Sequence, residues 1–165
     1  MAIPHRGWTS HDTYFVTAPT AGKRCVLQSE RMARLFIENL YHYREQEKYL
    51  VHEFVVMPNH FHLLVTPEVT LERSLQLIKG GFSYRARKEL QFLGEIWETS
   101  FYDRRVRDAS EYERLREYIR QNPVRARLTA MAKGYPYSSA NPKWLLDAVP
   151  QRLKPVLLAT TRSQS

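Results

Sequence analysis

The stretch Met57-Pro58-Asn59-His60-Phe61-His62-Leu63-Leu64-Val65 decides the fold of this chain. Its Pro58-Asn59 pair is a turn signal, and the residues that follow are apolar except for two histidines two positions apart. Side chains alternate between the two faces of a strand, so His60, His62 and Leu64 are expected on one face and Phe61, Leu63 and Val65 on the other. Neutral imidazole is a common metal ligand, which makes this strand a candidate metal site.

The segments around this strand predict an alternation of strands and helices. The turn joins it to an apolar segment before it, as in an antiparallel hairpin. Ser29 is expected to cap the first helix, Ser110 and Glu113 to form a capping box at the start of the third, and Pro123 to end the third near residue 121 or 122. We expect strands at 12–18, 49–57, 60–66 and 96–106, and helices at 29–47, from 71 to about 88, and from 110. The fold class is therefore α+β: a ferredoxin-like βαββαβ antiparallel sheet with helices on one face, plus a third helix.

Three segments carry more specific expectations. Gly80-Gly81 interrupts the second helix, where glycine costs about 1 kcal/mol relative to alanine, and so indicates either a kink or the close approach of another backbone. The first eleven residues are expected to be loose. The chain after residue 140 is expected to form a C-terminal extension, 141–165, with a short helix around Trp144-Leu145-Leu146 and a frayed tail.

Composition indicates the number of domains and the cellular compartment. The chain has 165 residues, 43% of them apolar, which suits one domain with a good-sized core. We expect a cytoplasmic protein, because no apolar run could span a bilayer, no signal peptide is evident, and the lone Cys25 can form no intrachain disulfide or cysteine-based zinc cluster.

The basic balance points to a nucleic-acid partner. Lysine and arginine number 25 against 17 acidic residues, for a net charge of +8 and a pI near 9.7, with the excess after residue 79. Arginine pairs bidentately with phosphate and stacks on bases. The residues that we expect to grip DNA are Lys79, Arg85, Arg87, Lys88, Arg104, Arg105 and Arg125, each of which has a solvated surface charge as its alternative interpretation.

The third helix offers a candidate nucleophile. Tyr118 and Asn122 are four residues apart and share one face of a helix, where Leu115 and Ile119 could seat it on the sheet. If this face packs near the histidines, two nitrogens and one amide oxygen could hold a metal beside a phenol. A phenol has a pKa near 10 and needs a cation or base beside it to attack a phosphodiester. Spacing alone favours a half-buried core tyrosine as the interpretation of Tyr118, and a helix-ending residue is at least as good an interpretation of Asn122.

Five segments of the chain form a recognisable series: 57–65, 79–82, 96–97 with 101–105, 118–124 and 135–139. In this order, from about residue 12 to 140, they resemble the REP-associated tyrosine transposases, a group of the single-tyrosine HUH transposases. Two features depart from the pattern. Arg120 stands where some relatives carry a second aromatic residue, and the tail after residue 140 matches nothing recognisable.

The resemblance implies a transposase domain at 1–140 that binds hairpins of repetitive extragenic palindromes and cleaves and rejoins adjoining single-stranded DNA. It implies Tyr118 as the catalytic nucleophile that forms a 5′-phosphotyrosine link, and His60, His62 and Asn122 as ligands of Mg²⁺ or Mn²⁺. It implies no membrane, and favours a monomer over a homodimer.

Two other functions stay open. A domesticated protein would bind hairpin DNA through its arginines without cutting it. A hydrolase would activate water at the metal with a further carboxylate, for which Glu53 and Glu68 are candidates, and would leave Tyr118 structural. Histidines 5, 11, 42 and 52 lack comparable spacing and are expected to be surface or satisfied polar residues.

Overall fold

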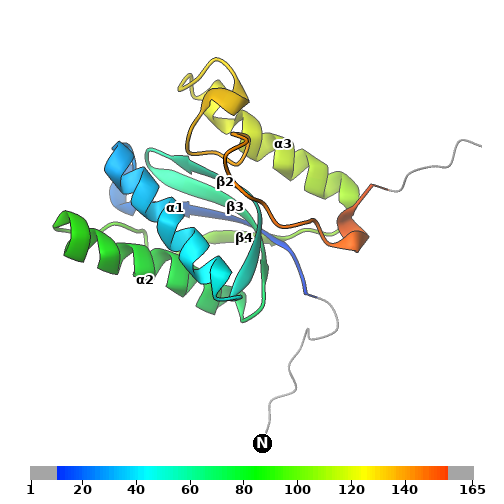
Figure 1. Cartoon of the computed structure of the whole chain (residues 1–165), viewed down its shortest axis with the longest axis horizontal. Helices are drawn as coiled ribbons and strands as arrows, with labels where there is room; N and C mark the ends of the chain where they lie inside the picture. The colour runs from blue at the N-terminus through cyan, green and yellow to red at the C-terminus, as the bar shows by residue number, and fades with distance from the viewer. Residues whose placement is uncertain (1–10, 156–165) are drawn as a thin grey trace, which may run out of the picture.

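The computed structural model describes residues 11–155 and confirms an α+β fold with four strands and three helices in the described part of the chain (Figure 1). The elements are β1 (Tyr14–Pro19), α1 (Glu30–Glu45), β2 (Tyr49–Met57), β3 (His60–Pro67), α2 (Leu71–Leu90), β4 (Tyr102–Arg105) and α3 (Ala109–Arg125). The fourth strand is shorter than expected. Of the segment before it, Trp97 pairs with Thr20 in an isolated bridge and the rest is irregular.

The strands form one antiparallel sheet in the order β2-β3-β1-β4. The hairpin of β2 and β3 turns at Pro58 and Asn59, as the sequence predicts. The turn is held from outside, because the backbone amide of Thr20 donates to the Asn59 carbonyl over 2.9 Å and that of Leu27 donates to the Pro58 carbonyl over 2.9 Å. This is the ferredoxin-like strand order, with β1 and β3 in the centre.

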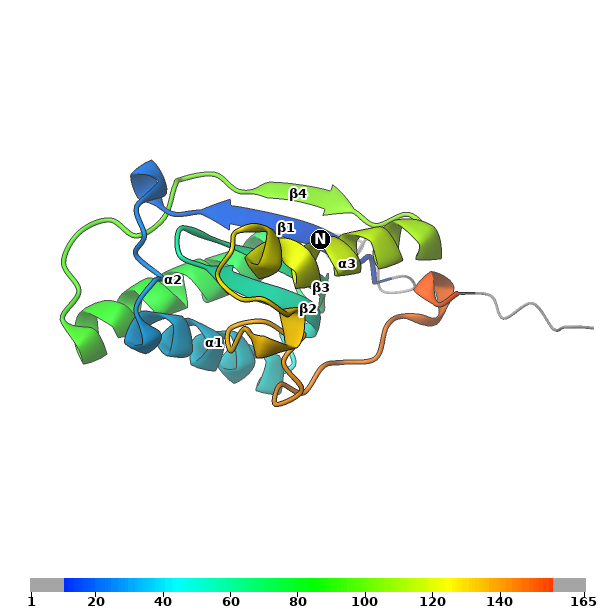
Figure 2. The ribbon, with the colours of Figure 1, turned by 90° about the horizontal axis from the view of Figure 1, so that it is seen from above.

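The two faces of the sheet carry different layers. α1 and α2 lie side by side on one face, while α3 crosses the other face (Figures 1 and 2). The side chains of β3 alternate accordingly: Phe61, Leu63 and Val65 enter the core under α1 and α2, and Leu64 joins the smaller core under α3. Period-two alternation therefore places both histidines on the α3 side. No helix within residues 11–155 is both long and apolar enough to cross a lipid bilayer.

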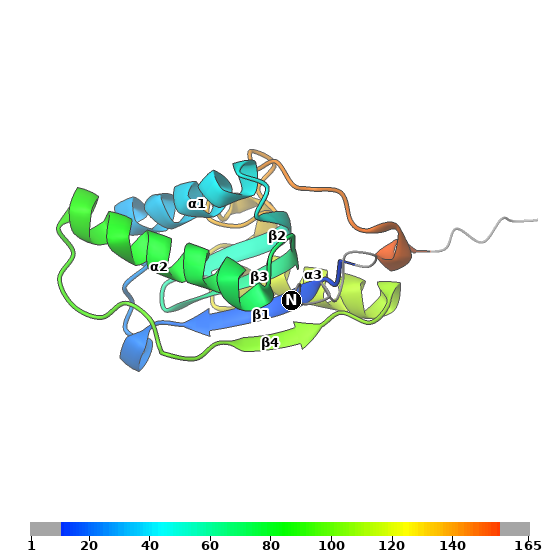
Figure 3. The same ribbon diagram turned by 90° about the horizontal axis from the view of Figure 1, so that it is seen from below.

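The glycine pair in α2 serves the contact between the two neighbouring helices (Figure 3). α2 runs unbroken through both glycines. A methyl group on Gly81 would lie 2.8 Å from Asn39 Oδ1 and 2.9 Å from Tyr43 Cε2, whereas one on Gly80 would meet nothing within 4 Å. The pair therefore causes no break in the helix, and Gly81 permits a close approach, although by the side chains of α1 and not by another backbone as expected.

Both predicted ends of α3 are wrong. The N-cap is Asp108, whose carboxylate accepts from the Glu111 amide over 2.8 Å, so Ser110 lies inside the first turn. At the other end the helix continues through Pro123 to Arg125. Proline removes one amide donor, but Pro123 is buried and its carbonyl accepts from the Leu128 amide over 2.9 Å. Tertiary packing thus outweighs the local stop signal.

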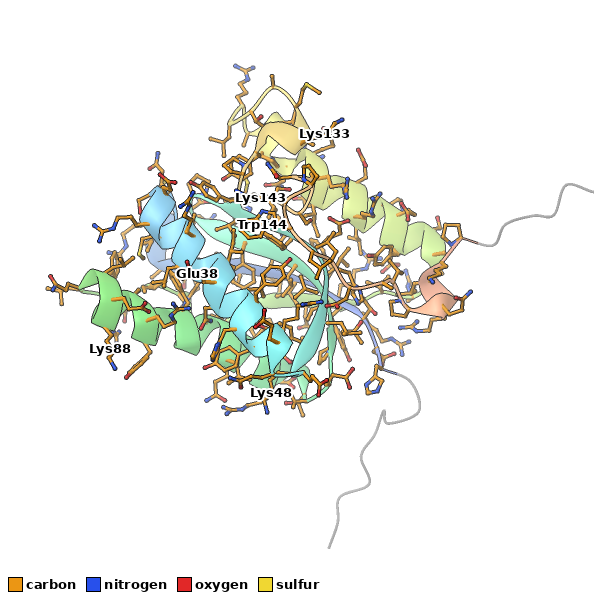
Figure 4. All side chains as sticks on the ribbon, in the orientation of Figure 1. Glu38, Lys48, Lys88, Lys133, Lys143 and Trp144 are labelled. Atoms are coloured by element: carbon orange, nitrogen blue, oxygen red, sulfur yellow. The ribbon has the colours of Figure 1, made fainter. Side chains whose placement is uncertain are left out.

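The predicted short helix around Trp144 is also absent from the described residues. Residues 144–150 run as an irregular strap past β2, and a single 3-10 turn follows at Gln151–Leu153. The strap binds the sheet edge instead of itself: the Asp147 amide donates to the Val51 carbonyl over 2.8 Å. Trp144 lies inward (Figure 4), with its ring 6.0 Å from that of Tyr41 and 5.9 Å from that of Phe54. The expectations of a loose start and a frayed tail, at residues 1–10 and 156–165, lie outside the described residues.

Candidate functional site

The two histidines of β3 form the floor of the candidate site. Their ring centroids are 4.7 Å apart at an interplanar angle of 75°. His62 is buried and stacks on Phe15 of the neighbouring strand, with centroids 5.3 Å apart. His60 is the first residue of β3 after the turn and is partly exposed. The pair is therefore fixed by the sheet beneath it and faces α3.

A hydrogen bond on one side of each ring sets which nitrogen is free. Asn59 Oδ1 lies 2.8 Å from His60 Nδ1, and because an amide oxygen only accepts, Nδ1 must donate. Thr17 Oγ1 lies 2.8 Å from His62 Nδ1, from the position directly across the β1–β3 ladder. The lone pair of His60 is therefore on Nε2. A threonine hydroxyl can donate or accept, so the lone pair of His62 is on Nε2 in the tautomer in which its Nδ1 donates to Thr17.

Burial keeps both rings neutral. It lowers the pKa of His62 to about 3, with further lowering by the neighbouring His60 and by the Arg125 cation, and only a partial offset from the Val16 carbonyl. Burial also lowers the pKa of His60, which the nearby Asn122 amide partly offsets. A metal ligand must be unprotonated, so this environment suits metal binding at neutral pH.

Tyr118 of α3 lies over this floor. Its ring centroid is 5.3 Å from that of His62 and 6.1 Å from that of Phe15, in edge-to-face geometry with both. Tyr118 remains 42% exposed. Arg125 covers the ring at 4.5 Å from its centroid. The structure thus brings together His60, His62 and Tyr118 from segments that are more than fifty residues apart in the sequence.

A buried carboxylate anchors α3 in this place. Glu53 of β2 accepts from Arg116 Nε over 3.0 Å and from Arg120 Nε over 3.3 Å, and Ser139 Oγ donates to its other oxygen. The two arginines flank Tyr118 on the helix. Ile119 is fully buried in the apolar core under α3. Glu53 therefore links α3 to β2 through two ion pairs.

The ligands available to a metal are the two imidazoles and the Asn122 amide. In the chain from residue 11 to 155, no three histidine, cysteine or acidic side chains gather into a possible metal cluster. Glu53 is taken up by its arginines, and Glu68 lies 3.6 Å from His11. Two nitrogens and one oxygen fit a divalent cation that completes its shell with water or phosphate oxygens.

The seven basic residues expected to grip DNA do not form one patch. Arg85, Arg87 and Lys88 are on α2, in the layer opposite α3, as Figure 4 shows for Lys88. Arg85 pairs with Glu89 at 2.6 Å and Glu38 at 3.2 Å. Lys79 Nζ donates to the Glu98 carbonyl over 3.0 Å, and burial lowers its pKa.

The remaining candidates lie on other elements. Arg104 and Arg105 are on the edge strand β4, where Arg104 pairs with Glu111 at 3.0 Å and Arg105 lies 3.8 Å from Asp12. Arg87 is exposed. Of the seven, Arg125 is the residue that contacts the candidate site.

Sequence reasoning missed the residues that orient the imidazoles. Asn59 stands directly before His60, so its adjacency was a usable signal. Thr17 lies 45 positions away from His62, and its role follows only from the register of β1 against β3. Phe15 and Glu53 are likewise visible only in the assembled sheet.

Comparison with known proteins gives the geometry its context. The model of the family described as "Transposase IS200 like" matches residues 10–122. An uncharacterized protein of Haemophilus influenzae is 22% identical over 157 residues, covering 75% of this chain and 87% of its own.

Two solved structures are similar in fold. One, a REP-associated tyrosine transposase bound to a REP hairpin, superposes with a TM-score of 0.68 at 18% identity and covers 96% of this chain and 100% of its own. The other, a putative transposase from Deinococcus radiodurans, has a TM-score of 0.51 at 21% identity and covers 72% of this chain and 95% of its own. The family match spans β1 to α3, the same segment that assembles the histidines and Tyr118. The chain belongs to the IS200-like transposases.

Proposed function

We propose that this protein is a metal-dependent single-stranded DNA endonuclease and transposase that binds hairpin-forming repetitive palindromes and cleaves and rejoins DNA through a 5′-phosphotyrosine intermediate. The observation that carries the proposal is the position of Tyr118, partly exposed and 5.3 Å from the buried His62 ring. The family membership supports a transposase. The fold neighbour that was solved with a REP hairpin supports hairpin DNA as the partner.

The proposed reaction is an exchange of phosphodiesters. The Tyr118 hydroxyl oxygen attacks phosphorus, the bond from phosphorus to the 3′ oxygen breaks, and that oxygen leaves with a proton as a free 3′-hydroxyl. Because the new tyrosyl bond is itself a phosphodiester, a 3′-hydroxyl can attack it and restore the DNA without ATP. The edge-to-face contacts of Tyr118 with His62 and Phe15 place the ring beside the histidines for this attack.

His60, His62 and the Asn122 amide would hold Mg²⁺ or Mn²⁺. When bound, such a cation supplies positive charge to the phosphate oxygens, where charge develops in the transition state. Thr17 and Asn59 engage the Nδ1 atoms of the two rings, which leaves the Nε2 atoms for that role when each Nδ1 is the donor. We also propose that a single chain suffices, since one chain contributes the histidines, the amide and the tyrosine.

The decisive experiment incubates a labelled hairpin carrying a single-stranded flank with wild type and with Tyr118→Phe, with and without Mn²⁺. We expect a covalent protein–DNA adduct and a free 3′-hydroxyl from wild type with metal, and neither product from Tyr118→Phe. Tyr102→Phe is the matched control. This variant should cleave DNA as wild type does, because Tyr102 is 71% exposed on the edge strand β4.

The other outcomes identify the alternatives. Hairpin binding without any adduct would indicate a binding protein that no longer cuts. Cleavage that persists in Tyr118→Phe and leaves 5′-phosphate ends would indicate a hydrolase with an activated water.

A further inference from the structure

Arg125 was expected to bind DNA, but its side chain contacts Tyr118 within the protein. The guanidinium carbon of Arg125 lies 4.5 Å from the centre of the Tyr118 ring, and its Nη2 donates to the Tyr118 backbone carbonyl over 3.0 Å. We propose that Arg125 is a positioning residue that holds the Tyr118 ring in its attacking orientation. This inference rests on the proposed function, because it assigns a role within the same site.

The end of α3 makes this contact possible. Arg125 is seven residues after Tyr118, two turns further along the helix, and its side chain folds back toward the ring. The helix persists through Pro123, which places Arg125 in the last turn on the same side as Tyr118. Had the helix ended before the proline, as the sequence predicts, Arg125 would have no defined position relative to the ring.

The Tyr118 ring needs such a restraint. Its known neighbours on the sheet side are the edges of His62 and Phe15, and 42% of the side chain is exposed. A tyrosine on a helix surface can swing between rotamers about its first side-chain torsion. The Arg125 guanidinium adds a contact over the ring, 4.5 Å from its centroid, to the edge contacts of His62 and Phe15, and this restricts that swing.

The chemistry of arginine suits the task. Its planar guanidinium stacks on an aromatic ring while its in-plane N–H groups remain free to donate. Here one of these groups already donates to the Tyr118 backbone carbonyl, so the guanidinium contacts both the ring and the backbone of Tyr118. Lysine can offer a cation to the ring but lacks the planar fork, so it should replace Arg125 only in part.

The test is single-turnover cleavage of the hairpin substrate over a range of DNA concentrations by wild type, Arg125→Gln and Arg125→Lys. For Arg125→Gln we expect the maximal rate constant to fall by about 10²-fold, the cost of misplacing a reacting group by about 1 Å, with the half-saturating DNA concentration unchanged. Arg125→Lys should recover part of the rate. Arg127→Gln is the matched control, since it removes the same charge two residues away, where the Arg127 backbone amide donates to the Val124 carbonyl but no side-chain hydrogen bond, ion pair or ring contact of Arg127 is found among the described residues.

An effect on the half-saturating DNA concentration instead of the maximal rate constant would overturn the inference. If Arg125→Gln raises the half-saturating concentration and leaves the maximal rate unchanged, Arg125 grips DNA. If both parameters stay at wild-type values, it does neither.

A measurement without catalysis separates this inference from the proposed function. 3-Fluorotyrosine incorporated at position 118 reports ring environment by ¹⁹F NMR in the absence of DNA. We expect the chemical shift and the linewidth of this resonance to change in Arg125→Gln. In Arg127→Gln both should keep their wild-type values. A changed resonance in a protein that forms no adduct would retain the positioning role and reject the transposase chemistry, whereas an unchanged resonance would reject the positioning role itself.

Discussion

At the scale of single residues, the chemistry of the candidate site is set by partners on the far side of each ring. Thr17 and Asn59 engage the Nδ1 atoms of His62 and His60, each over 2.8 Å. Groups that orient a metal ligand in this way fix its tautomer and ring plane, and their loss commonly costs 10 to 100-fold in metal affinity. The two residues are therefore part of the site although neither would touch the metal.

Thr17→Val tests this role. Valine has the shape of threonine without the hydroxyl, so we expect the affinity for Mn²⁺ to fall by about 10-fold, measured by titration with electron paramagnetic resonance. Thr17→Ser retains the hydroxyl and should bind Mn²⁺ as wild type does. Equal affinity in the valine and serine variants would show that the hydrogen bond does not orient His62.

At the scale of elements, the contact between α1 and α2 depends on one of two adjacent glycines. Gly81 faces Asn39, whose amide donates to the Ile78 carbonyl over 3.0 Å and to the Leu77 carbonyl over 3.3 Å. Asn39 is buried and held by these bonds, so it cannot give way to a new methyl group at low cost. Gly80 faces open space on the same helix.

The adjacent glycines give a matched pair of substitutions. Gly80→Ala should raise the free energy of unfolding by up to about 1 kcal/mol, because alanine restricts the unfolded chain and favours the helix. Gly81→Ala should lower it by about 1 to 3 kcal/mol, because the methyl group overpacks the contact with Asn39 and Tyr43. Urea unfolding of both variants measures the difference, and shifts of the same sign would contradict the assignment of Gly81 to the helix contact.

At the scale of the whole molecule, the strap at 144–150 ties the sheet edge to α1. The Asp147 carboxylate accepts from Arg44 over 2.7 and 2.8 Å and from the Val51 amide over 2.8 Å. The Asp147 carbonyl in turn lies 3.1 Å from His52 Nδ1, and His52 Nε2 lies 2.7 Å from Thr66 Oγ1. His52 is buried, and both of its ring nitrogens have hydrogen-bond partners within the protein, as expected for a histidine outside the site.

This network predicts a dependence of stability on pH. Burial lowers the pKa of His52 below its usual 6.5. Below pH 6.5 the unfolded chain binds a proton at this residue that the folded chain does not, so stability falls as the pH falls from 6.5 toward the lowered pKa. Between pH 7.5 and 5.5 wild type should lose up to about 1 kcal/mol more unfolding free energy than His52→Gln, as measured by urea unfolding at both values.

The control for this measurement is a histidine on the surface. His42 is exposed on α1, so His42→Gln should keep the wild-type pH dependence. A slope in His52→Gln equal to that of wild type would show that His52 does not titrate differently in the two states.

Much of the fold and the floor of the site could be predicted because the signals are local. The turn at Pro58-Asn59 and the period of the β3 residues place His60 and His62 on one face whatever the rest of the chain does. The Ser29 cap, the hairpin and the order of the elements follow from similar short-range patterns.

Where the sequence prediction was wrong, a distant contact outweighed a local preference. Burial keeps Pro123 inside α3, and Asp108 caps that helix in place of Ser110. The sheet edge takes up the backbone donor at Asp147, near where a helix around Trp144 was expected.

What the sequence by itself determined is the ferredoxin-like order of strands and helices and the pairing of two imidazoles on one strand. Only the tertiary structure decided that α3 lies on the opposite face from α1 and α2, that the buried Glu53 anchors it through Arg116 and Arg120, and that Tyr118 contacts both His62 and Arg125. The physical reason is range. Periodicity and caps act over a few residues, whereas the meeting of these groups depends on strand register and layer packing, which the whole chain must form before any of these contacts exists.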